Sequence, residues 1–282
     1  SFNIDSSDDS IHTNDSIVIN GGSFTIASGD DGIHADTTLD INGGTIDITK
    51  SYEGLESTTI TINDGTIHLI ASDDGINAAG GNDGSAMNGR PGQNNFSSTS
   101  GMIYFNGGYV YVNASGDGLD ANGSIEMSGG TVIVDGPTDG GNGALDYDAT
   151  FNISGGLLIA SGSNAMLQTP SSSSSQNTIV VSSNTSSHTL VNIQDSTGTD
   201  LITYAPSKSS QVIMISSPEF KTGETYTIST GGTSTGTEID GLYKGGSYSG
   251  GSNVATLTIS SSITSNGNLN NGMGGPGGMG RP

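Results

Sequence analysis

The chain has 282 residues, a formal net charge of −22 and six Lys and Arg residues in total. A surface this acidic repels phosphate groups, which argues against nucleic acid and anionic lipid as partners. No apolar run is long enough to span a bilayer, so membrane insertion is not expected, and the absence of cysteine excludes disulfides and thiol chemistry.

Residues 1–170 repeat with a period of about 22 residues. An acidic residue, usually followed by glycine, recurs at Asp9, Asp31, Glu53, Asp74 and Asp117, and a glycine-containing turn follows each time. Between these markers apolar and polar residues alternate, which is the spacing of a β-strand. The longer steps correspond to one repeat plus an insertion, at 79–101 and 136–142.

A unit this short cannot bury its apolar face alone, whereas stacked units share a continuous core. Three short strands per repeat, with Gly and Asn at the corners, predict an all-β fold. We expect a right-handed parallel β-helix of about seven turns over residues 1–170. Six repeats are clear, and a degraded seventh begins at Ser163.

From residue 171 the repeat gives way to ordinary strand patterns separated by turns. We expect residues 171–265 to form a β cap or small β subdomain that closes the open end of the helix. Residues 266–282 form a tail rich in Gly, Met and Pro. The strands expected in the cap are Thr178–Ser182, Thr189–Gln194, Gln211–Ile215, Thr225–Ser229 and Val254–Ile259.

Stacking the repeats places the recurring acids in one column and the residues three positions later in a second column. Carboxylates at strand spacing repel one another, and Ca²⁺, which takes six to eight oxygen ligands, would relieve this repulsion. A solvated acidic face, or Asp residues that simply favour turns, is the alternative. The expected Ca²⁺ ligands are Asp9, Asp30, Asp31, Glu53, Glu56, Asp73, Asp74, Asn77, Asp117, Asp120 and Asp146.

Histidine and asparagine also recur in the repeat. His12 and His34 stack in the second column, but two histidines without a third evident ligand make a weak transition-metal site, so we expect surface or Ca²⁺-adjacent histidines. Asparagines at the glycine corners form a structural ladder without a ligand role; they are Asn20, Asn42, Asn63 and Asn106.

Tyrosines are the candidate sugar-binding residues, since flat exposed rings suit stacking on sugars. Val110 and Val112 point inward, so Tyr109 and Tyr111 should point outward together. Strand propensity on a solvent-exposed face explains such residues equally well. The candidate ligand-binding residues are Tyr52, Tyr104, Tyr109, Tyr111 and Tyr147.

Catalysis has little support in the sequence. Elimination in uronate polymers needs a base, and the repeat region offers only Lys50 and Arg90. Carboxylate pairs for glycoside hydrolysis could be drawn almost anywhere on the acidic face, so they indicate nothing specific. We therefore expect a protein without enzymatic activity.

Several long motifs carry a family resemblance. They are S-D-D-G-I-N-A-A-G-G-N-D-G-S (72–85), A-S-G-D-G-L-D-A-N-G-S-I (114–125), G-G-T-V-I-V-D-G-P-T (129–138), N-G-A-L-D-Y-D (142–148) and G-G-T-S-T-G-T-E-I-D-G-L-Y (231–243). With them, most of the chain resembles secreted bacterial β-helix proteins known as carbohydrate-binding domains. The resemblance implies a pectate-lyase-like fold, bound Ca²⁺, and binding to cellulose or to acidic plant polysaccharides such as polygalacturonate.

These observations favour a secreted, non-catalytic protein that binds acidic or plant cell-wall polysaccharide with the help of Ca²⁺. The composition suits an exported bacterial protein, and the chain begins directly in strand-like sequence, as expected of a mature secreted chain. Two alternatives remain. One is a structural surface or filament subunit assembled through the helix ends or the Gly-rich tail, and the other is a weak Ca²⁺-dependent lyase.

Overall fold

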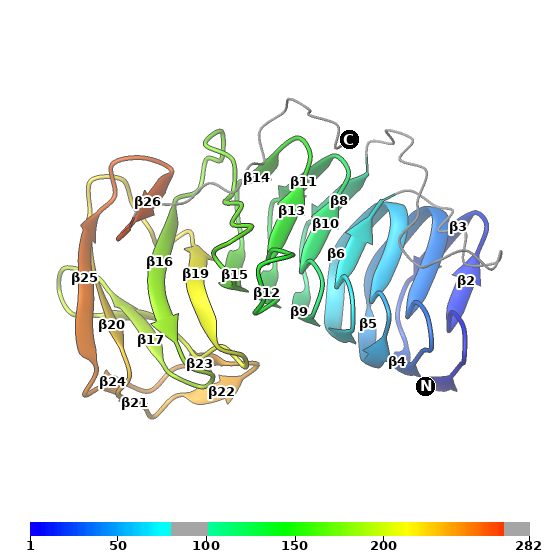
Figure 1. The fold of residues 1–282 in the computed structure, drawn as a ribbon, viewed down its shortest axis with the longest axis horizontal. Helices are drawn as coiled ribbons and strands as arrows, with labels where there is room; N and C mark the ends of the chain where they lie inside the picture. Colours follow the sequence, from blue (N-terminus) through cyan, green and yellow to red (C-terminus); the bar gives the residue numbers. More distant parts are fainter. Residues whose placement is uncertain (80–100, 268–282) are drawn as a thin grey trace.

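The computed structural model describes residues 1–79 and 101–267, and in both ranges the chain is all-β (Figure 1). No helix long and apolar enough to cross a membrane occurs in these two ranges. The N-terminal part is a β-solenoid whose turns stack side by side, and the C-terminal strands lie at the end opposite the N-terminus (Figure 1). The predicted all-β solenoid is therefore confirmed.

Each solenoid turn has three strand positions, which we call the first, second and third faces in chain order. Strands on one face pair in parallel with the same face of the next turn. Strands β5 (Ile33–Ser51) and β6 (Leu55–Ala71) each run through all three faces of a turn.

The remaining first-face strands are β2 (Ile11–Thr13), β7 (Ile76–Ala78), β10 (Leu119–Ala121) and β13 (Leu145–Tyr147). The second face holds β3 (Ser16–Ile19), β8 (Met102–Phe105), β11 (Ser124–Met127) and β14 (Phe151–Ile153). The third face holds β1 (Phe2–Asp5), β4 (Ser23–Ala27), β9 (Tyr109–Ala114), β12 (Thr131–Asp135) and β15 (Leu157–Gly162).

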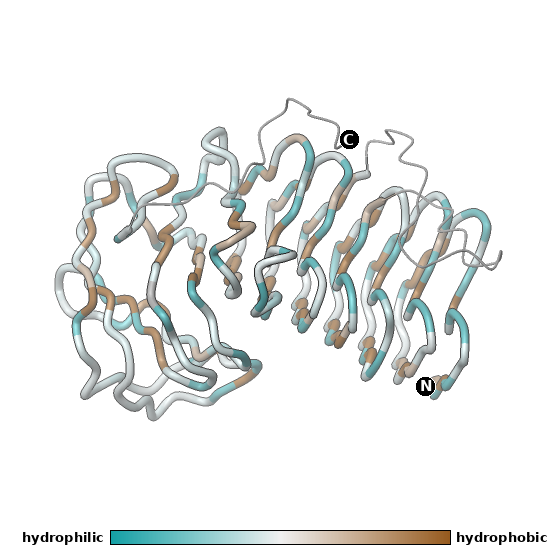
Figure 2. Tube along the Cα trace, viewed as in Figure 1, coloured by the Kyte–Doolittle hydropathy of each residue, from teal (hydrophilic) through white to brown (hydrophobic). Residues whose placement is uncertain are grey.

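Alternating apolar residues fill the solenoid interior. Leu39, Ile41, Ile46 and Ile48 of one turn are fully buried, and each stacks on an apolar residue of the next turn. Hydrophobic segments recur at equivalent places in successive turns (Figure 2). The short strands are therefore stabilised by one continuous core rather than by their own contacts.

Glycine is required at two corners of the repeat for different reasons. Gly44 has φ +102°, a conformation that side chains disfavour, and a Cβ there would lie 2.8 Å from the carbonyl oxygen of Gly22. Gly54, which follows the column acid, would place a Cβ 2.4 Å from the carbonyl oxygen of Gly75 in the next turn. The glycine that follows Asp31, Glu53, Asp74 and Asp117 thus allows the turns to approach closely beside the acidic column.

The asparagine corner forms the predicted structural ladder. The side-chain amide of Asn42 donates to Asn20 Oδ1 at 2.9 Å, Asn63 donates to Asn42 at 2.8 Å, and Asn106 donates to Asn63 at 2.9 Å. The amides bond to one another along the solenoid and so help to hold its register.

The solenoid has about six turns, and the expectation of about seven is wrong. Residues 163–177 contain no strand. Beyond β15, the next strand on the third face is β19 (Ser210–Ser216), which pairs antiparallel with β15. A reversed strand cannot continue parallel stacking, so the regular repeat stops there. The predicted boundary at residue 170 falls within this strand-free stretch.

The C-terminal strands form two layers. Strand β19 also pairs antiparallel with β16 (Thr178–Thr185), which pairs with β26 (Ile263–Ser265), so the third face continues past the last turn. A separate six-stranded sheet contains β22 (Thr237–Ile239), β23 (Leu242–Lys244), β18 (Asp200–Tyr204), β17 (Val191–Gln194), β20 (Thr225–Thr230) and β25 (Ser252–Thr258). A small two-stranded sheet pairs β21 (Thr233–Ser234) with β24 (Tyr248–Ser249).

The six-stranded sheet packs against the outer side of the third face. Ile133 and Ile159 point out of the solenoid and join a second apolar core with Ile215 and with residues of the six-stranded sheet such as Val191. All five strands expected in this region are present. The additional short strands β18, β21–β24 and β26 were not predicted from the sequence.

Candidate functional site

The first acidic column is built into the hydrogen bonding between turns. The backbone N–H of Asp31 donates to Asp9 Oδ1 at 3.1 Å, and that of Glu53 donates to Asp31 Oδ1 at 3.2 Å. Further along, the N–H of Asp117 donates to Asp74 Oδ1 at 2.6 Å, and Gly143 donates to Asp117 in the same way. One carboxylate oxygen of each of these residues therefore supports the stack, and the second oxygen of Asp9 and of Asp31 lies near His34 of the second column.

The second column lies on the first face in strict register. Its members, in spatial order, are His12, His34, Glu56, Asn77, Asp120 and Asp146. Asn77 is 4% exposed, and its amide nitrogen donates to Glu53 Oε2 at 2.8 Å. Its Oδ1 is buried without a hydrogen-bond partner among the described residues. An acceptor in this position points to a missing cation or donor.

Burial and mutual repulsion disfavour ionised carboxylates in the columns. Burial, with Asp117 and Asp73 nearby, raises the pKa of Asp74 to about 7. Burial, with Asp74 and Asp146 nearby, raises the pKa of Asp120 to about 8. Burial likewise raises the pKa of Glu53 well above its usual value, with repulsion from Asp31 and Asp74 adding to the shift.

Burial raises the pKa of other acids in the columns as well, except for Asp9. Burial raises the pKa of both Asp31 and Asp117 to about 6 and also raises that of Asp146. Burial alone would raise the pKa of Asp9, but hydrogen bonds from the His34 side chain and the Asp31 backbone outweigh it and lower that pKa.

Two all-oxygen groups bring carboxylates within 4.8 Å of one another. Asp74, Asp117 and Asp120 form one of them, beside the unpartnered oxygen of Asn77. Asp8, Asp9 and Asp30 form the other, at the N-terminal end of the column. Oxygen donors without nitrogen or sulfur fit a hard cation such as Ca²⁺.

Two of the predicted site residues, Tyr52 and Asp146, also form hydrogen bonds within the protein. The Tyr52 hydroxyl hydrogen-bonds to Asp73, an interaction that raises the pKa of Tyr52. Asp146 accepts a hydrogen bond from the Gln168 side chain at 2.6 Å. Gln168 therefore ends the second column after the last turn.

The histidine pair is surrounded by carboxylates. The rings of His12 and His34 stack with centroids 4.7 Å apart. His34 is only 2% exposed, so it is not a surface histidine, and the alternative expectation of a histidine next to the Ca²⁺ ligands stays a prediction. Its Nδ1 lies 3.2 Å from Asp9, 3.8 Å from Asp31 and 3.7 Å from Glu56.

Tyr109 and Tyr111 point out of the solenoid as expected, but the inference that they form a freely exposed pair is wrong. Both are partly buried against the core beneath the six-stranded sheet. The Tyr109 hydroxyl donates to Asp240 at 2.8 Å, and the Tyr111 hydroxyl donates to Asp135 at 3.0 Å. The sheet that covers them begins at Val191, 80 residues after Tyr111 in the sequence, which the repeat does not reveal.

The remaining tyrosines differ in their surroundings. Tyr147 packs edge-on against Phe151 and donates its hydroxyl hydrogen to the carbonyl of Thr169 at 2.6 Å, which is a structural arrangement. Tyr104 lies on the outer side of the second face between Thr61 and Glu126. Tyr52 and Tyr104 are thus partly exposed on the outer surface, and Tyr52 lies next to the acidic column.

Three polar residues beside these groups were missed by the sequence reasoning. Asp36 Oδ1 lies 3.5 Å from His34 Nε2 and 3.9 Å from His12 Nε2. His68, which stacks on Tyr111 in register, contacts Asp240 at 2.8 Å. Asp36 could have been found because it lies two residues after His34 in a strand, whereas the distant Asp240 leaves no signal in the repeat.

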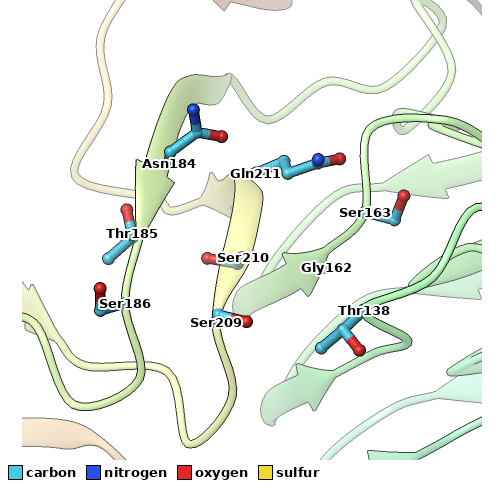
Figure 3. A pocket seen from close by; sticks show the side chains of 9 residues that line it. All are labelled: Thr138, Gly162, Ser163, Asn184, Thr185, Ser186, Ser209, Ser210 and Gln211. Atoms are coloured by element: carbon cyan, nitrogen blue, oxygen red, sulfur yellow. The ribbon is translucent and has the colours of Figure 1, made fainter.

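Two pockets lie where the solenoid meets the C-terminal strands. One, of about 490 Å³, is lined by Tyr111, Tyr243 and the acidic residues Glu238 and Asp240, among others. The other, of about 260 Å³, lies between β15, β16 and β19 and is lined by glycine and uncharged polar side chains (Figure 3). It contains no aromatic or charged residue to orient a ligand.

Two residues, Lys50 and Arg90, were considered for lyase chemistry. Lys50 is exposed at the end of β5. Arg90 lies outside the described residues.

Comparison with known proteins gives one similarity. Residues 31–75 match the model of a family described as carbohydrate-binding domain-containing protein. No curated protein and no solved structure matches the chain. The matched segment spans β5 and β6 and includes Asp31, Glu53 and Asp74 of the first acidic column, and it supports carbohydrate binding as the function of this solenoid.

Proposed function

We propose that this protein binds acidic or plant cell-wall polysaccharide outside the cell, without catalysis, and that the binding depends on Ca²⁺. The observation that carries the proposal is the convergence of Asp74, Asp117 and Asp120 within 4.8 Å, beside the buried and unpartnered Oδ1 of Asn77. A bound cation would neutralise the three carboxylates and would also give Asn77 Oδ1 a partner.

The protein residues contribute position and charge. Asp74 and Asp117 are each held by a backbone N–H of the following turn, so their carboxylates do not have to be ordered when a ligand arrives. Burial, and after it repulsion between neighbouring carboxylates, raises the pKa values of Asp74 and Asp120. A hard cation would remove that repulsion and keep the carboxylates ionised at neutral pH.

An acidic polysaccharide is the ligand class that this site suits best. A chain with a net charge of −22 repels a polyanion directly, so attraction needs an intermediary of opposite charge. Bound Ca²⁺ would supply a positive centre whose coordination sphere a uronate carboxylate can complete. Tyr52, beside the acidic column, is the aromatic side chain best placed to contact a sugar ring.

Affinity electrophoresis tests the proposal directly. The protein is run through gels that contain polygalacturonate, a soluble cellulose derivative or a neutral glucan, with Ca²⁺ or with a chelator. We expect polygalacturonate to slow migration when Ca²⁺ is present and to have no effect with chelator. Equal migration in all gels would contradict the proposal and favour a structural role. Unsaturated product released from polygalacturonate would favour a lyase.

Substitutions distinguish Ca²⁺ binding by these particular carboxylates from attraction by the overall negative charge of the protein. Asp74→Asn and Asp120→Asn should each weaken Ca²⁺ binding and polygalacturonate retardation by about tenfold or more, because each removes an anionic ligand. Asp40→Asn is the matched control, since it removes one carboxylate from the second face of the same solenoid. Calorimetric Ca²⁺ titration of the three variants checks this, and equal effects of all three would point to bulk charge alone.

A further inference from the structure

We propose that the first two turns of the solenoid carry a transition-metal site of the Zn²⁺ class, distinct from the all-oxygen site at Asp74. Its ligands are Nδ1 of His12, Nδ1 of His34 and Oδ2 of Asp9. The inference rests on the histidine geometry alone and does not depend on polysaccharide binding or on Ca²⁺.

Parallel stacking aligns the two imidazoles for a shared ligand. His12 and His34 occupy equivalent positions of β2 and β5, and their rings stack at 23° with centroids 4.7 Å apart. Both rings present Nδ1 to the same carboxylate oxygen, Asp9 Oδ2, at 2.9 and 3.2 Å. Three donor atoms of the types that Zn²⁺ prefers therefore converge, all within 4.8 Å of one another.

The opposite edge of both rings faces a second carboxylate. Asp36 Oδ1 lies 3.5 Å from Nε2 of His34 and 3.9 Å from Nε2 of His12. Metal-binding histidines usually direct their other ring nitrogen to a carboxylate, which sets the tautomer and the ring orientation. Asp36 is thus a positioning residue for both ligands.

The local charge also calls for a cation. Besides Asp9 and Asp36, the carboxylates of Asp31 and Glu56 lie 3.8 and 3.7 Å from His34 Nδ1, and both side chains are 2% exposed. Four carboxylates therefore surround two imidazoles, and even two protonated histidines would leave an excess of negative charge in a buried place. A divalent metal supplies the same two positive charges as two protonated histidines, and it bonds directly to the nitrogen and oxygen donors that converge here.

The second column changes its ligand type along the solenoid. It begins with two imidazoles in the first two turns and continues with oxygen donors from Glu56 onward. Imidazole nitrogen favours Zn²⁺ and its neighbours in the first transition series, whereas carboxylate and amide oxygen favour Ca²⁺. One ladder can therefore hold two metals of different chemistry at its two ends.

Calorimetric titration with Zn²⁺ tests the site in the full chain, purified without a histidine tag and kept in excess Ca²⁺ so that the group of Asp74, Asp117 and Asp120 is saturated. Asp9 also belongs to the group with Asp8 and Asp30, so Zn²⁺ has to displace any Ca²⁺ there, which its preference for imidazole nitrogen favours. We expect one Zn²⁺ per chain under these conditions. His12→Gln should weaken Zn²⁺ binding by about a hundredfold, and Asp36→Asn by about 10–100-fold. His12 is 42% exposed, so this variant should fold. Asp120→Asn is the matched control and should leave Zn²⁺ binding unchanged.

Cobalt provides an independent spectroscopic readout. Co²⁺ bound to two nitrogen ligands should give visible d–d absorption that His12→Gln abolishes and Asp120→Asn preserves. Absence of Zn²⁺ binding in excess Ca²⁺ would overturn the proposal, as would equal Zn²⁺ affinity in wild type and His12→Gln. Absence of polysaccharide binding in the wild-type protein, with Zn²⁺ binding intact, would count against the proposed function only.

Discussion

Asp74 shows how a single carboxylate serves two purposes in this solenoid. Its Oδ1 accepts a hydrogen bond from the Asp117 backbone, which stabilises the stack of turns. The same side chain lies near Asp117 and Asp120, where burial and repulsion raise its pKa to about 7. At neutral pH the metal-free protein therefore has to accommodate carboxylates that the fold holds too close together.

The close approach of these buried carboxylates predicts how the stability of the metal-free protein depends on pH. The pKa values of Asp74 and Asp120, about 7 and about 8, lie above the value of about 3.9 expected when the chain is unfolded. For carboxyls shifted upward, the stabilisation is fully present below pH ~4 and is lost as the pH rises through the folded-state pKa values. In chelator, the melting temperature should thus fall between pH 5 and pH 8.

Adding Ca²⁺ provides the control for this measurement. Ca²⁺ binds the ionised carboxylates, so it should raise the melting temperature more at pH 8 than at pH 5. A melting temperature in chelator that rises steadily from pH 5 to pH 8 would contradict the proposed repulsion in the column.

At the scale of elements, each strand is too short to be stable alone and depends on the equivalent strand of the next turn. Besides the core, polar ladders at the corners couple the turns. In the asparagine ladder, Asn63 donates to Asn42 and accepts from Asn106, whereas Asn20 at the end only accepts. An interior rung therefore holds two turns at once.

The position of an asparagine in the ladder predicts how much stability its replacement by alanine removes. Asn63→Ala should lower the free energy of unfolding by about 1–3 kcal/mol, because two hydrogen bonds of about 0.5–1.5 kcal/mol each are lost. Asn20→Ala loses only one bond and should cost about half as much. Urea unfolding monitored by circular dichroism measures both variants. Equal costs would show that the rungs act as isolated surface contacts.

At the scale of the whole molecule, the C-terminal strands both end the solenoid and cover one of its faces. The antiparallel β19 pairs with β15, and the six-stranded sheet packs over Ile133 and Ile159. Residues of the last solenoid turns therefore belong to the core of the C-terminal part, and Val180, Val212 and Met214 of the C-terminal strands belong to the core of the solenoid. This arrangement protects the open edge that a stack of parallel strands leaves at its end.

The shared core predicts cooperative unfolding of the two parts. Ile159→Ala should lower the free energy of unfolding by about 2–5 kcal/mol, since Ile159 is fully buried between the solenoid and the cap. Ile70→Ala is the matched control, because Ile70 is 50% exposed on β6 and its loss should cost little. Differential scanning calorimetry should give one transition in each case. Two separate transitions, with only one shifted by Ile159→Ala, would contradict the coupling.

The repeat by itself determined the solenoid, its corners and its acidic columns. Because parallel stacking places a residue beside its counterpart about 22 positions later, sequence spacing translates directly into contact. The columns through Asp31 and His34 and the asparagine ladder follow from this rule alone. The same rule could not tell that the seventh repeat lacks strands, because a weakened pattern does not reveal that β19 takes the next place on the third face.

The tertiary structure alone decided which outward residues remain accessible. Tyr109 and Tyr111 have the period of exposed strand residues, yet the six-stranded sheet covers them, and Asp240 contacts His68 from 172 positions away. Contacts of this kind arise between segments that share no period, so spacing carries no information about them. The orientation of both His12 and His34 toward Asp9 likewise depends on ring rotations that only the packed structure determines.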